Sequence, residues 1–243
     1  MLKLLIIWTV LVLTSEFILA QPQLAVDNFE HDFGFTPQES IIAHKVWVKS
    51  TGDTTLQIRS IKTGCGCVAA LPASAEISPG DSLPIMFYWD TRASRGSVKR
   101  TSYLFTNAGT DPFRIDMTAD CHLSYGASEQ DILVSPSTIL VAYPRAGGTI
   151  EHSFSITNRS DENRAISMVD VSVSGMEIMV PDTVPAGSTI QGRLTLNAEN
   201  WSPGLAGSVT IEFPTDGSPR DRVTIPVTGG QSRIETVLTK TKE

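Results

Sequence analysis

The sequence lacks the motifs of the common enzyme classes. It contains no Gly-x-Ser-x-Gly nucleophile elbow, no glycine-rich phosphate loop followed by Lys and Ser or Thr, no His-Glu-x-x-His motif and no dinucleotide-binding fingerprint. Its acidic residues are scattered, mostly at turns or on polar faces, where a solvated surface role is the ordinary one. We therefore expect a protein that is not an enzyme and uses no cofactor.

Clusters of basic residues are also absent. The 243 residues include 19 Lys and Arg against 26 Asp and Glu, which gives a formal net charge of −7. The chain therefore has no basic field that would attract a phosphate backbone. We expect no nucleic acid partner.

Long apolar runs are missing except at the N-terminus. There, Lys3 is followed by the nearly uninterrupted hydrocarbon of Leu4–Leu13, and Ala20 precedes Gln21 and Pro22. This pattern predicts a secretory signal peptide over residues 1–20. A retained membrane anchor is the alternative, but the apolar run is far shorter than the roughly 20 residues that a spanning helix needs. We expect a periplasmic or extracellular mature chain without a membrane span.

Helical periodicity is absent from the rest of the chain. From Leu24 onward, short alternating runs are separated by Gly, Pro, Asn, Asp and Ser, which is typical of an all-β protein. Apolar residues alternate with polar ones through Ile42–Lys49, and Leu83–Trp89 places its odd-numbered residues on one face. About seven such strands within roughly 100 residues predict a β-sandwich.

The pattern then repeats at an offset near 110 residues, which is the size of one whole sandwich. Four segments of the first copy match the second: 43–50 with 151–158, 50–53 with 158–161, 77–82 with 184–188, and 96–98 with 207–209. The sequence therefore predicts two tandem domains, residues 24–124 and 131–230, followed by a flexible tail over residues 231–243.

The first domain resembles an exported bacterial family of unknown function. The resemblance rests on ordered motifs: a Phe-Gly opening at Phe33-Gly34, the turn Ser50–Asp53, the Cys65-Gly66-Cys67 motif and the turn Pro79–Asp81. It departs from the family pattern at Ser50, where Asn is usual, and at Val68, where Thr follows the second cysteine. The resemblance implies an immunoglobulin-like sandwich similar to abnormal-spindle, Hydin and major sperm protein domains, and it implies no established activity.

Cysteine is scarce, and two of the three cysteines are close together. Cys65 and Cys67 lie in a glycine-rich segment, whereas Cys121 lies on the inward face of a predicted strand that turns His122 outward. An exported protein can form disulfides. The first interpretation is a structural disulfide between Cys121 and one member of the pair. The second is that all three are small buried apolar residues, since the repeat places Val173 opposite Cys65 and Gly175 opposite Cys67.

Two chemical interpretations of the cysteines stay open. In the redox interpretation, Cys65 and Cys67 form their own disulfide or a reactive pair that Cys121 resolves. In the metal interpretation, the three thiolates and a histidine bind a soft ion. His44 recurs as His152 in the copy that has no cysteines, so we interpret His44 as part of the fold, and we predict no metal site.

We therefore expect an exported, non-enzymatic binding or structural module of the cell envelope, whose partner is a protein or another envelope component. The alternative is a thiol-redox or soft-metal-handling protein that uses the Cys65-Gly66-Cys67 motif.

Overall fold

The computed structural model describes residues 20–123, 130–141, 148–197, 199, 206–214 and 222–229. The predicted signal peptide (except Ala20), most of the linker between the predicted domains, and the predicted tail lie outside the described residues. We call residues 20–123 the first half and residues 130–229 the second half. No helix among the described residues has the length and hydropathy to cross a membrane.

The first half is built from two antiparallel-rich sheets that face each other. One sheet has the order β1-β3-β7-β5, and the other runs β2-β9-β8-β4-β6. The strands are β1 (Leu24–Val26), β2 (Glu30–Pro37), β3 (Ile41–Ser50), β4 (Leu56–Thr63), β5 (Val68–Pro72), β6 (Glu76–Ile77), β7 (Ser82–Asp90), β8 (Gly96–Thr106) and β9 (Phe113–His122).

The second half repeats this arrangement. Its sheet β10-β12-β17-β15 has the same connectivity as β1-β3-β7-β5, and its strands β14, β18 and β19 correspond to β4, β8 and β9. The strands are β10 (Ile132–Ser135), β11 (Ile139–Leu140), β12 (Thr149–Asn158), β13 (Arg164–Ala165), β14 (Ser167–Val171), β15 (Met176–Met179), β16 (Thr183–Val184), β17 (Thr189–Asn197), β18 (Ala206–Glu212) and β19 (Arg222–Thr228). The predicted all-β sandwich architecture is confirmed.

The predicted strand faces are also confirmed. The odd-numbered residues Leu83–Trp89 of β7 are buried, and Val46 and Val48 of β3 are buried between the exposed Trp47 and Lys49. At the other end of β3 both faces are buried, because β18 packs against that part of the strand and Ala206 joins a small cluster with Ala43. Apolar alternation therefore locates the strand, and contact with the second half explains why the alternation of burial stops.

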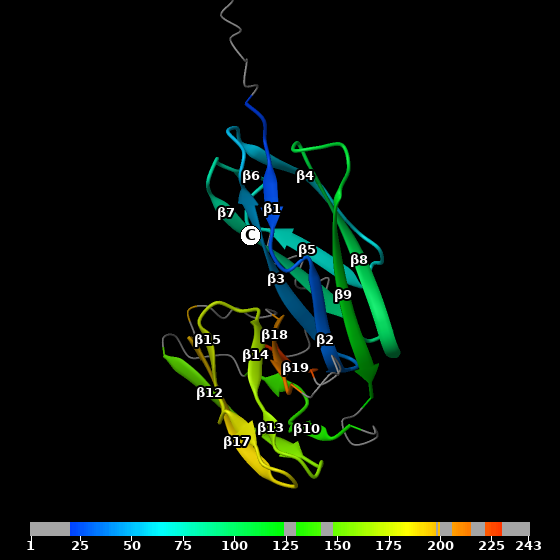
Figure 1. Ribbon diagram of the computed structural model, residues 1–243, viewed down its shortest axis with the longest axis vertical. Helices are drawn as coiled ribbons and strands as arrows, with labels where there is room; N and C mark the ends of the chain where they lie inside the picture. The colour runs from blue at the N-terminus through cyan, green and yellow to red at the C-terminus, as the bar shows by residue number, and fades with distance from the viewer. Residues whose placement is uncertain are drawn as a thin grey trace, which may run out of the picture.

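One continuous sheet connects the two halves. The strand β2 pairs with β9 on one side and contacts β19 in parallel on the other, at the Val223–Phe35 bridge (Figure 1). At Gly34 the register of β2 shifts, and this bulge turns successive aromatic residues in opposite directions. Phe33 joins the core of the first half, and Phe35 joins the core of the second.

Equivalent backbone hydrogen bonds confirm most of the predicted repeat and correct one part of it. Val68 donates to Cys65 O as Met176 donates to Val173 O, and both bonds are 3.3 Å long. The repeat therefore places Val173 opposite Cys65, as predicted. However, Gly64 donates to Thr101 O whereas Ser172 donates to Ser208 O. Ser208 is thus equivalent to Thr101 rather than to Ser97, so the proposed match of 96–98 with 207–209 is wrong by four residues.

Candidate functional site

The Cys65-Gly66-Cys67 segment crosses from one sheet of the first half to the other. It follows β4 and precedes β5, which are on opposite sheets. The backbone is held on both sides, since Gly64 donates to Thr101 O at 3.0 Å and Asp90 donates to Cys67 O at 2.8 Å. Gly64 must remain small because a Cβ there would lie 2.9 Å from Thr101 O, whereas Gly66 faces open space. The loop is therefore anchored at its ends and open at its tip.

The structure joins Cys65 to Cys67 by a disulfide bond and leaves Cys121 as a free thiol. The Cα atoms of the pair are 5.2 Å apart, a normal separation for bonded cysteines. Cys121 is buried as predicted, with 1% of its surface exposed. Burial, followed by the nearby charge of Asp120, raises the pKa of the Cys121 thiol to about 11. This pairing differs from the first interpretation, in which Cys121 is bonded, and a buried protonated thiol is poorly suited to resolve a disulfide.

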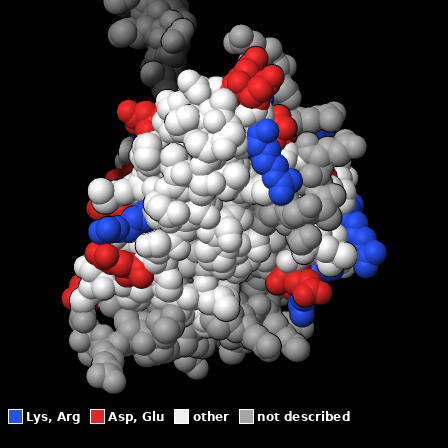
Figure 2. Space-filling view, turned by 90° about the horizontal axis from the view of Figure 1, so that it is seen from below, with Lys and Arg blue, Asp and Glu red and all other residues white. Residues whose placement is uncertain are grey.

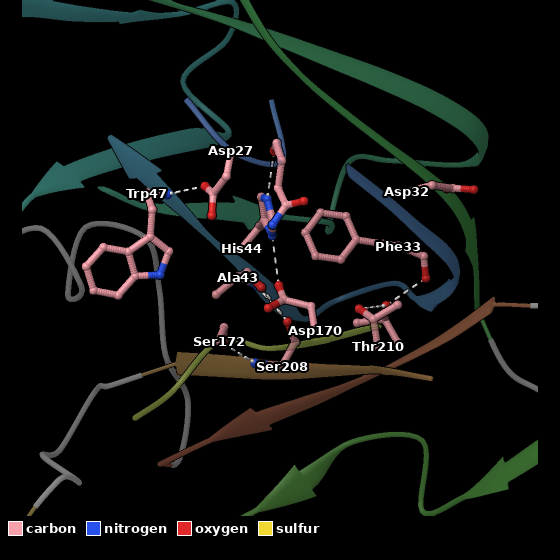
Figure 3. A network of polar contacts seen from close by, with 12 residues as sticks. Asp27, Asp32, Phe33, Ala43, His44, Trp47, Asp170, Ser172, Ser208 and Thr210 are labelled. Carbon is pink, nitrogen blue, oxygen red and sulfur yellow. Dashed lines mark hydrogen bonds and ion pairs between the residues drawn. The ribbon is translucent and has the colours of Figure 1, made fainter. Parts of the chain in front are cut away.

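A second group of polar residues lies where the two halves meet (Figure 3). The hydroxyl of Ser208 on β18 donates to Ala43 O at 2.7 Å and accepts from Ala43 N at 3.0 Å. Thr224 of β19 donates to Phe33 O at 2.6 Å. All four residues are buried. Hydroxyls of the second half thus satisfy backbone groups of β2 and β3 that would otherwise be costly to bury.

His44 belongs to the same junction. Its Nδ1 lies 2.8 Å from Asp170 Oδ2 on β14, and its Nε2 lies 3.2 Å from Asn28 O. His31 of β2 stacks on His44, with ring centroids 3.9 Å apart. Burial, then the charges of His44 and Arg222, lowers the pKa of His31 to about 2. The interpretation of His44 as part of the fold agrees with its burial, but the repeat does not predict its contacts with His31 and Asp170.

A charged cavity of about 280 Å³ opens on the outer face of the shared sheet. Asp116, which lines it, accepts hydrogen bonds from Thr101 at 2.6 Å and Lys99 at 2.8 Å. Burial pushes the pKa of Asp116 upward, but hydrogen bonds from Lys99, Thr101 and Arg114 outweigh it and hold the pKa below its ordinary value. The cavity is lined by Glu30, His31, Asp32, Lys99, Asp116, Thr118 and Arg222.

An exposed tyrosine and a half-buried phenylalanine lie beside this cavity. Cross-strand pairing places Tyr103 between Lys62 and Arg114, and 40% of the Tyr103 surface is exposed. Lys62 Nζ lies 5.0 Å from the centroid of the Phe105 ring, a cation–π contact. Gly64 is two strands from Asp116, roughly 10 Å at the usual strand spacing. The aromatic residues and the cavity thus share the outward face of β4, β8 and β9, which we call the β4-β8-β9 face. The disulfide lies at the end of β4, where Cys65 and Cys67 pack against the core between the two sheets.

The opposite end of the molecule has a different surface. The outward positions of β12 and β17 are mainly uncharged, with Ser153, Thr157 and Gln191 as examples. Figure 2 views this end and shows a broad uncharged area with Lys, Arg, Asp and Glu at its edges. Glu151 and Arg193 form an ion pair at 3.6 Å. This face serves below as the control surface.

Sequence patterns identified the three cysteines as candidate site residues, but they identified neither the cavity nor the junction between the halves. The cavity residues come from β2, β8, β9 and β19, and no motif connects them. For the junction, one usable signal existed: a glycine separates Phe33 from Phe35, and a glycine inside a strand pattern can mark a bulge.

Comparison with known proteins gives a family match for the first half of the chain. Residues 24–121 match the model of a family described as a protein of unknown function, DUF1573. This match confirms the resemblance of the first half to a family of unknown function. No curated protein matches the chain.

Several solved structures have low similarity to the chain. A protein of unknown function from Porphyromonas gingivalis W83 is 12% identical, with a TM-score of 0.33, 84% of this chain covered and 99% of that one. The Pseudomonas aeruginosa CupB2 chaperone is 11% identical, with a TM-score of 0.30 and coverage of 83% and 98%. The E. coli chaperone DraB is 11% identical, with a TM-score of 0.34 and coverage of 86% and 97%.

Proposed function

We propose that the protein is an exported, non-enzymatic binding module of the cell envelope, made of two immunoglobulin-like units, that recognises a protein or another envelope component through its β4-β8-β9 face. The signal-peptide pattern supports export. The observation that carries the proposal is the exposed Tyr103 between Lys62 and Arg114, beside a charged cavity.

This combination has the composition of an interaction surface. Aromatic residues and Arg are enriched where proteins bind one another, and a few such residues supply most of the binding energy. Tyr103 provides apolar contact area with a polar end, and Lys62 and Arg114 provide charges that orient a partner. The strands pair in regular register at Lys62, Tyr103 and Arg114, so this part of the face is pre-organised and little order is lost on binding.

The test is capture of envelope components with the wild-type protein and with a Tyr103→Ala, Lys62→Ala double variant. Both side chains are exposed, so the variant is expected to fold normally. We expect one discrete component to be retained by the wild type and lost by this variant. A Ser153→Ala, Gln191→Ala variant of the control surface is expected to retain it. Equal retention by both variants would show that the β4-β8-β9 face is not the binding surface.

A second candidate function is thiol-disulfide exchange at Cys65 and Cys67, and their direct pairing favours it. A disulfide between residues two apart closes a very small loop, so loop-entropy models assign it only about 1.6 kcal/mol, against about 4 kcal/mol for a bond to Cys121. The bond is therefore a weak structural cross-link. Both cysteines are partly exposed, which leaves the bond within reach of a partner.

In such a reaction, a thiolate of a dithiol partner attacks one sulfur and forms a mixed disulfide. The partner's second thiol then displaces the protein thiol, which leaves the partner oxidised and Cys65 and Cys67 reduced. Equilibration with glutathione buffers, followed by thiol alkylation, measures the midpoint potential. A potential within the range of known oxidoreductases would support this function, and a much more negative one would leave only a structural bond.

A further inference from the structure

Three side chains that can ligate a metal converge at the junction of the two halves. His31 comes from β2, His44 from β3 and Asp170 from β14, and one possible ligand atom of each lies within 4.8 Å of the others. His31 is 7% exposed and His44 is 2% exposed. The three residues are far apart in the sequence, so the fold itself brings them together.

The two ring nitrogens of His44 both face oxygen acceptors. Nδ1 faces a carboxylate oxygen of Asp170, and Nε2 faces the backbone carbonyl of Asn28. A neutral imidazole has one N–H, so it satisfies only one of these oxygens. If Nε2 carries the hydrogen and donates to Asn28 O, then Nδ1 faces the Asp170 carboxylate at 2.8 Å, and either a second ring proton or a bound metal ion must stabilise this contact.

This arrangement matches the surroundings of metal-binding histidines. Such a histidine usually donates its second ring N–H to a backbone carbonyl or carboxylate, which fixes the ring for binding. His44 and Asn28 O have this relationship. The 2.8 Å separation of Nδ1 and Oδ2 is shorter than the roughly 3.3 Å between neighbouring ligands of a tetrahedral Zn²⁺, so binding requires a small shift of the Asp170 side chain.

His31 can act as a third ligand through a ring nitrogen that makes no hydrogen bond. Its Nε2 is buried and has no hydrogen-bond partner among the described residues. Buried polar atoms without partners are rare, and an ion that binds them is one of the established explanations. Its ring is stacked on that of His44 at an angle of 14°, and ring lone pairs lie in the ring plane, so a shared ion requires the His31 ring to rotate toward it.

We propose that His31, His44 and Asp170 bind one divalent metal ion of the Zn²⁺ class, which links the two halves. Two imidazoles and one carboxylate, without sulfur, suit Zn²⁺ and similar borderline ions rather than Ca²⁺ or Mg²⁺, which prefer oxygen ligands. His31 also lines the charged cavity, which connects it to solvent and carries both acidic and basic side chains. This cavity belongs to the β4-β8-β9 face, so the metal site adjoins the proposed partner-binding surface.

Calorimetric titration of the full chain with Zn²⁺, with the disulfide intact, tests this proposal. We expect one Zn²⁺ per chain and a rise in melting temperature on binding. Asp170→Asn keeps the shape of a side chain that is 17% exposed and removes its charge, so it is expected to fold and to bind Zn²⁺ at least tenfold more weakly. His31→Gln is expected to weaken binding similarly.

The matched control is His122→Ala. His122 Nε2 lies 3.0 Å from Asp120 Oδ1, so this residue is also in a histidine–aspartate pair, but it lies outside the cluster. We expect this variant, and a Cys65→Ser, Cys67→Ser variant, to bind Zn²⁺ as the wild type does. Absence of stoichiometric binding by the wild type would overturn the proposal, because a proton would then lie between His44 and Asp170. Unchanged binding by both Asp170→Asn and His31→Gln would overturn it as well.

Discussion

Phe33 and Phe35 are two residues apart on β2, yet their side chains lie in the hydrophobic cores of different halves of the protein. Both are almost fully buried, with 0% and 1% of their surfaces exposed. The bulge at Gly34 makes this possible because it adds a residue to the strand and reverses the side chain that follows. β2 is therefore a common structural element of both sandwiches.

Gly34 combines a left-handed backbone conformation with a close backbone neighbour, so a side chain is poorly tolerated there. Its φ is +61°, and a Cβ would overlap the backbone of Arg222 on β19. We expect Gly34→Ala to lower the free energy of unfolding by more than about 2 kcal/mol, because the left-handed conformation alone costs about 1 to 2 kcal/mol. Urea denaturation measures the change.

Substitutions at two other glycines separate the cost of the left-handed conformation from the cost of the steric overlap. Gly80 has a φ of +85° but faces open space, so Gly80→Ala measures the conformational cost alone. Gly66 faces open space and lacks a positive φ, so Gly66→Ala is expected to change stability by less than about 0.5 kcal/mol. A loss in Gly34→Ala no larger than that in Gly80→Ala would contradict the close approach of β2 and β19.

Removal of the Phe35 ring is expected to destabilise the second half although the residue belongs to the first. Phe35→Ala should cost about 3 to 5 kcal/mol, as do other large deletions in cores. Hydrogen exchange locates the effect: we expect faster exchange in β18 and β19 than in β7 and β8. Phe33→Ala is the matched variant and should show the reverse pattern. If both variants accelerated exchange only in β7 and β8, the assignment of Phe35 to the second core would be wrong.

The cysteines should differ in accessibility. In the native, unreduced protein we expect no thiol that reacts with Ellman's reagent, because Cys65 and Cys67 are bonded and Cys121 is buried. Unfolding without reductant should expose one thiol, and unfolding with prior reduction should expose three. If the free thiol in the unfolded, unreduced protein mapped to Cys65 or Cys67, then Cys121 would be in the bond instead.

The protonation of Cys121 predicts how stability depends on alkaline pH. Burial, with the charge of Asp120, raises its pKa from 9.0 to about 11, so the folded state holds this proton more tightly than the unfolded chain does. The contribution of this pKa shift to the free energy of unfolding is fully present below pH 9.0 and is lost as the pH rises to about 11. At about 1.36 kcal/mol for each pKa unit, the loss approaches 2.7 kcal/mol.

Denaturation of wild type and Cys121→Ala across this pH range isolates the contribution. We expect the variant to have a lower stability at neutral pH and to lose stability less steeply above pH 9.0. Parallel curves for the two proteins would show that the Cys121 thiol ionises normally.

Local sequence patterns predicted the individual strands, but they did not predict how the two halves meet. Alternation in β3 and β7 revealed which residues face inward, because one face of each strand lies on a core. The same logic correctly placed Cys121 inside. The junction could not be predicted in this way, because it depends on the bulge at Gly34 and on hydroxyls such as that of Ser208, whose sequence context is an ordinary strand.

The pairing of the cysteines illustrates a second limit. Spacing alone allowed bonds from either cysteine of the pair to Cys121, and the larger loop favoured that bond energetically. The register of the sheet instead places Cys121 far from the Cys65-Gly66-Cys67 segment. Thr63 pairs with Ser102 and Cys121 pairs with Gly96, positions six residues apart on β8, or roughly 20 Å.

The binding role of the β4-β8-β9 face is tested most directly by site-specific photo-crosslinking in an exporting host. A crosslinking residue replaces Tyr103 in one protein and Gln191 of the control surface in another. We predict a discrete crosslinked species with an envelope component from position 103 and none from position 191. Crosslinks from position 191 alone, or none from position 103, would contradict the proposed function.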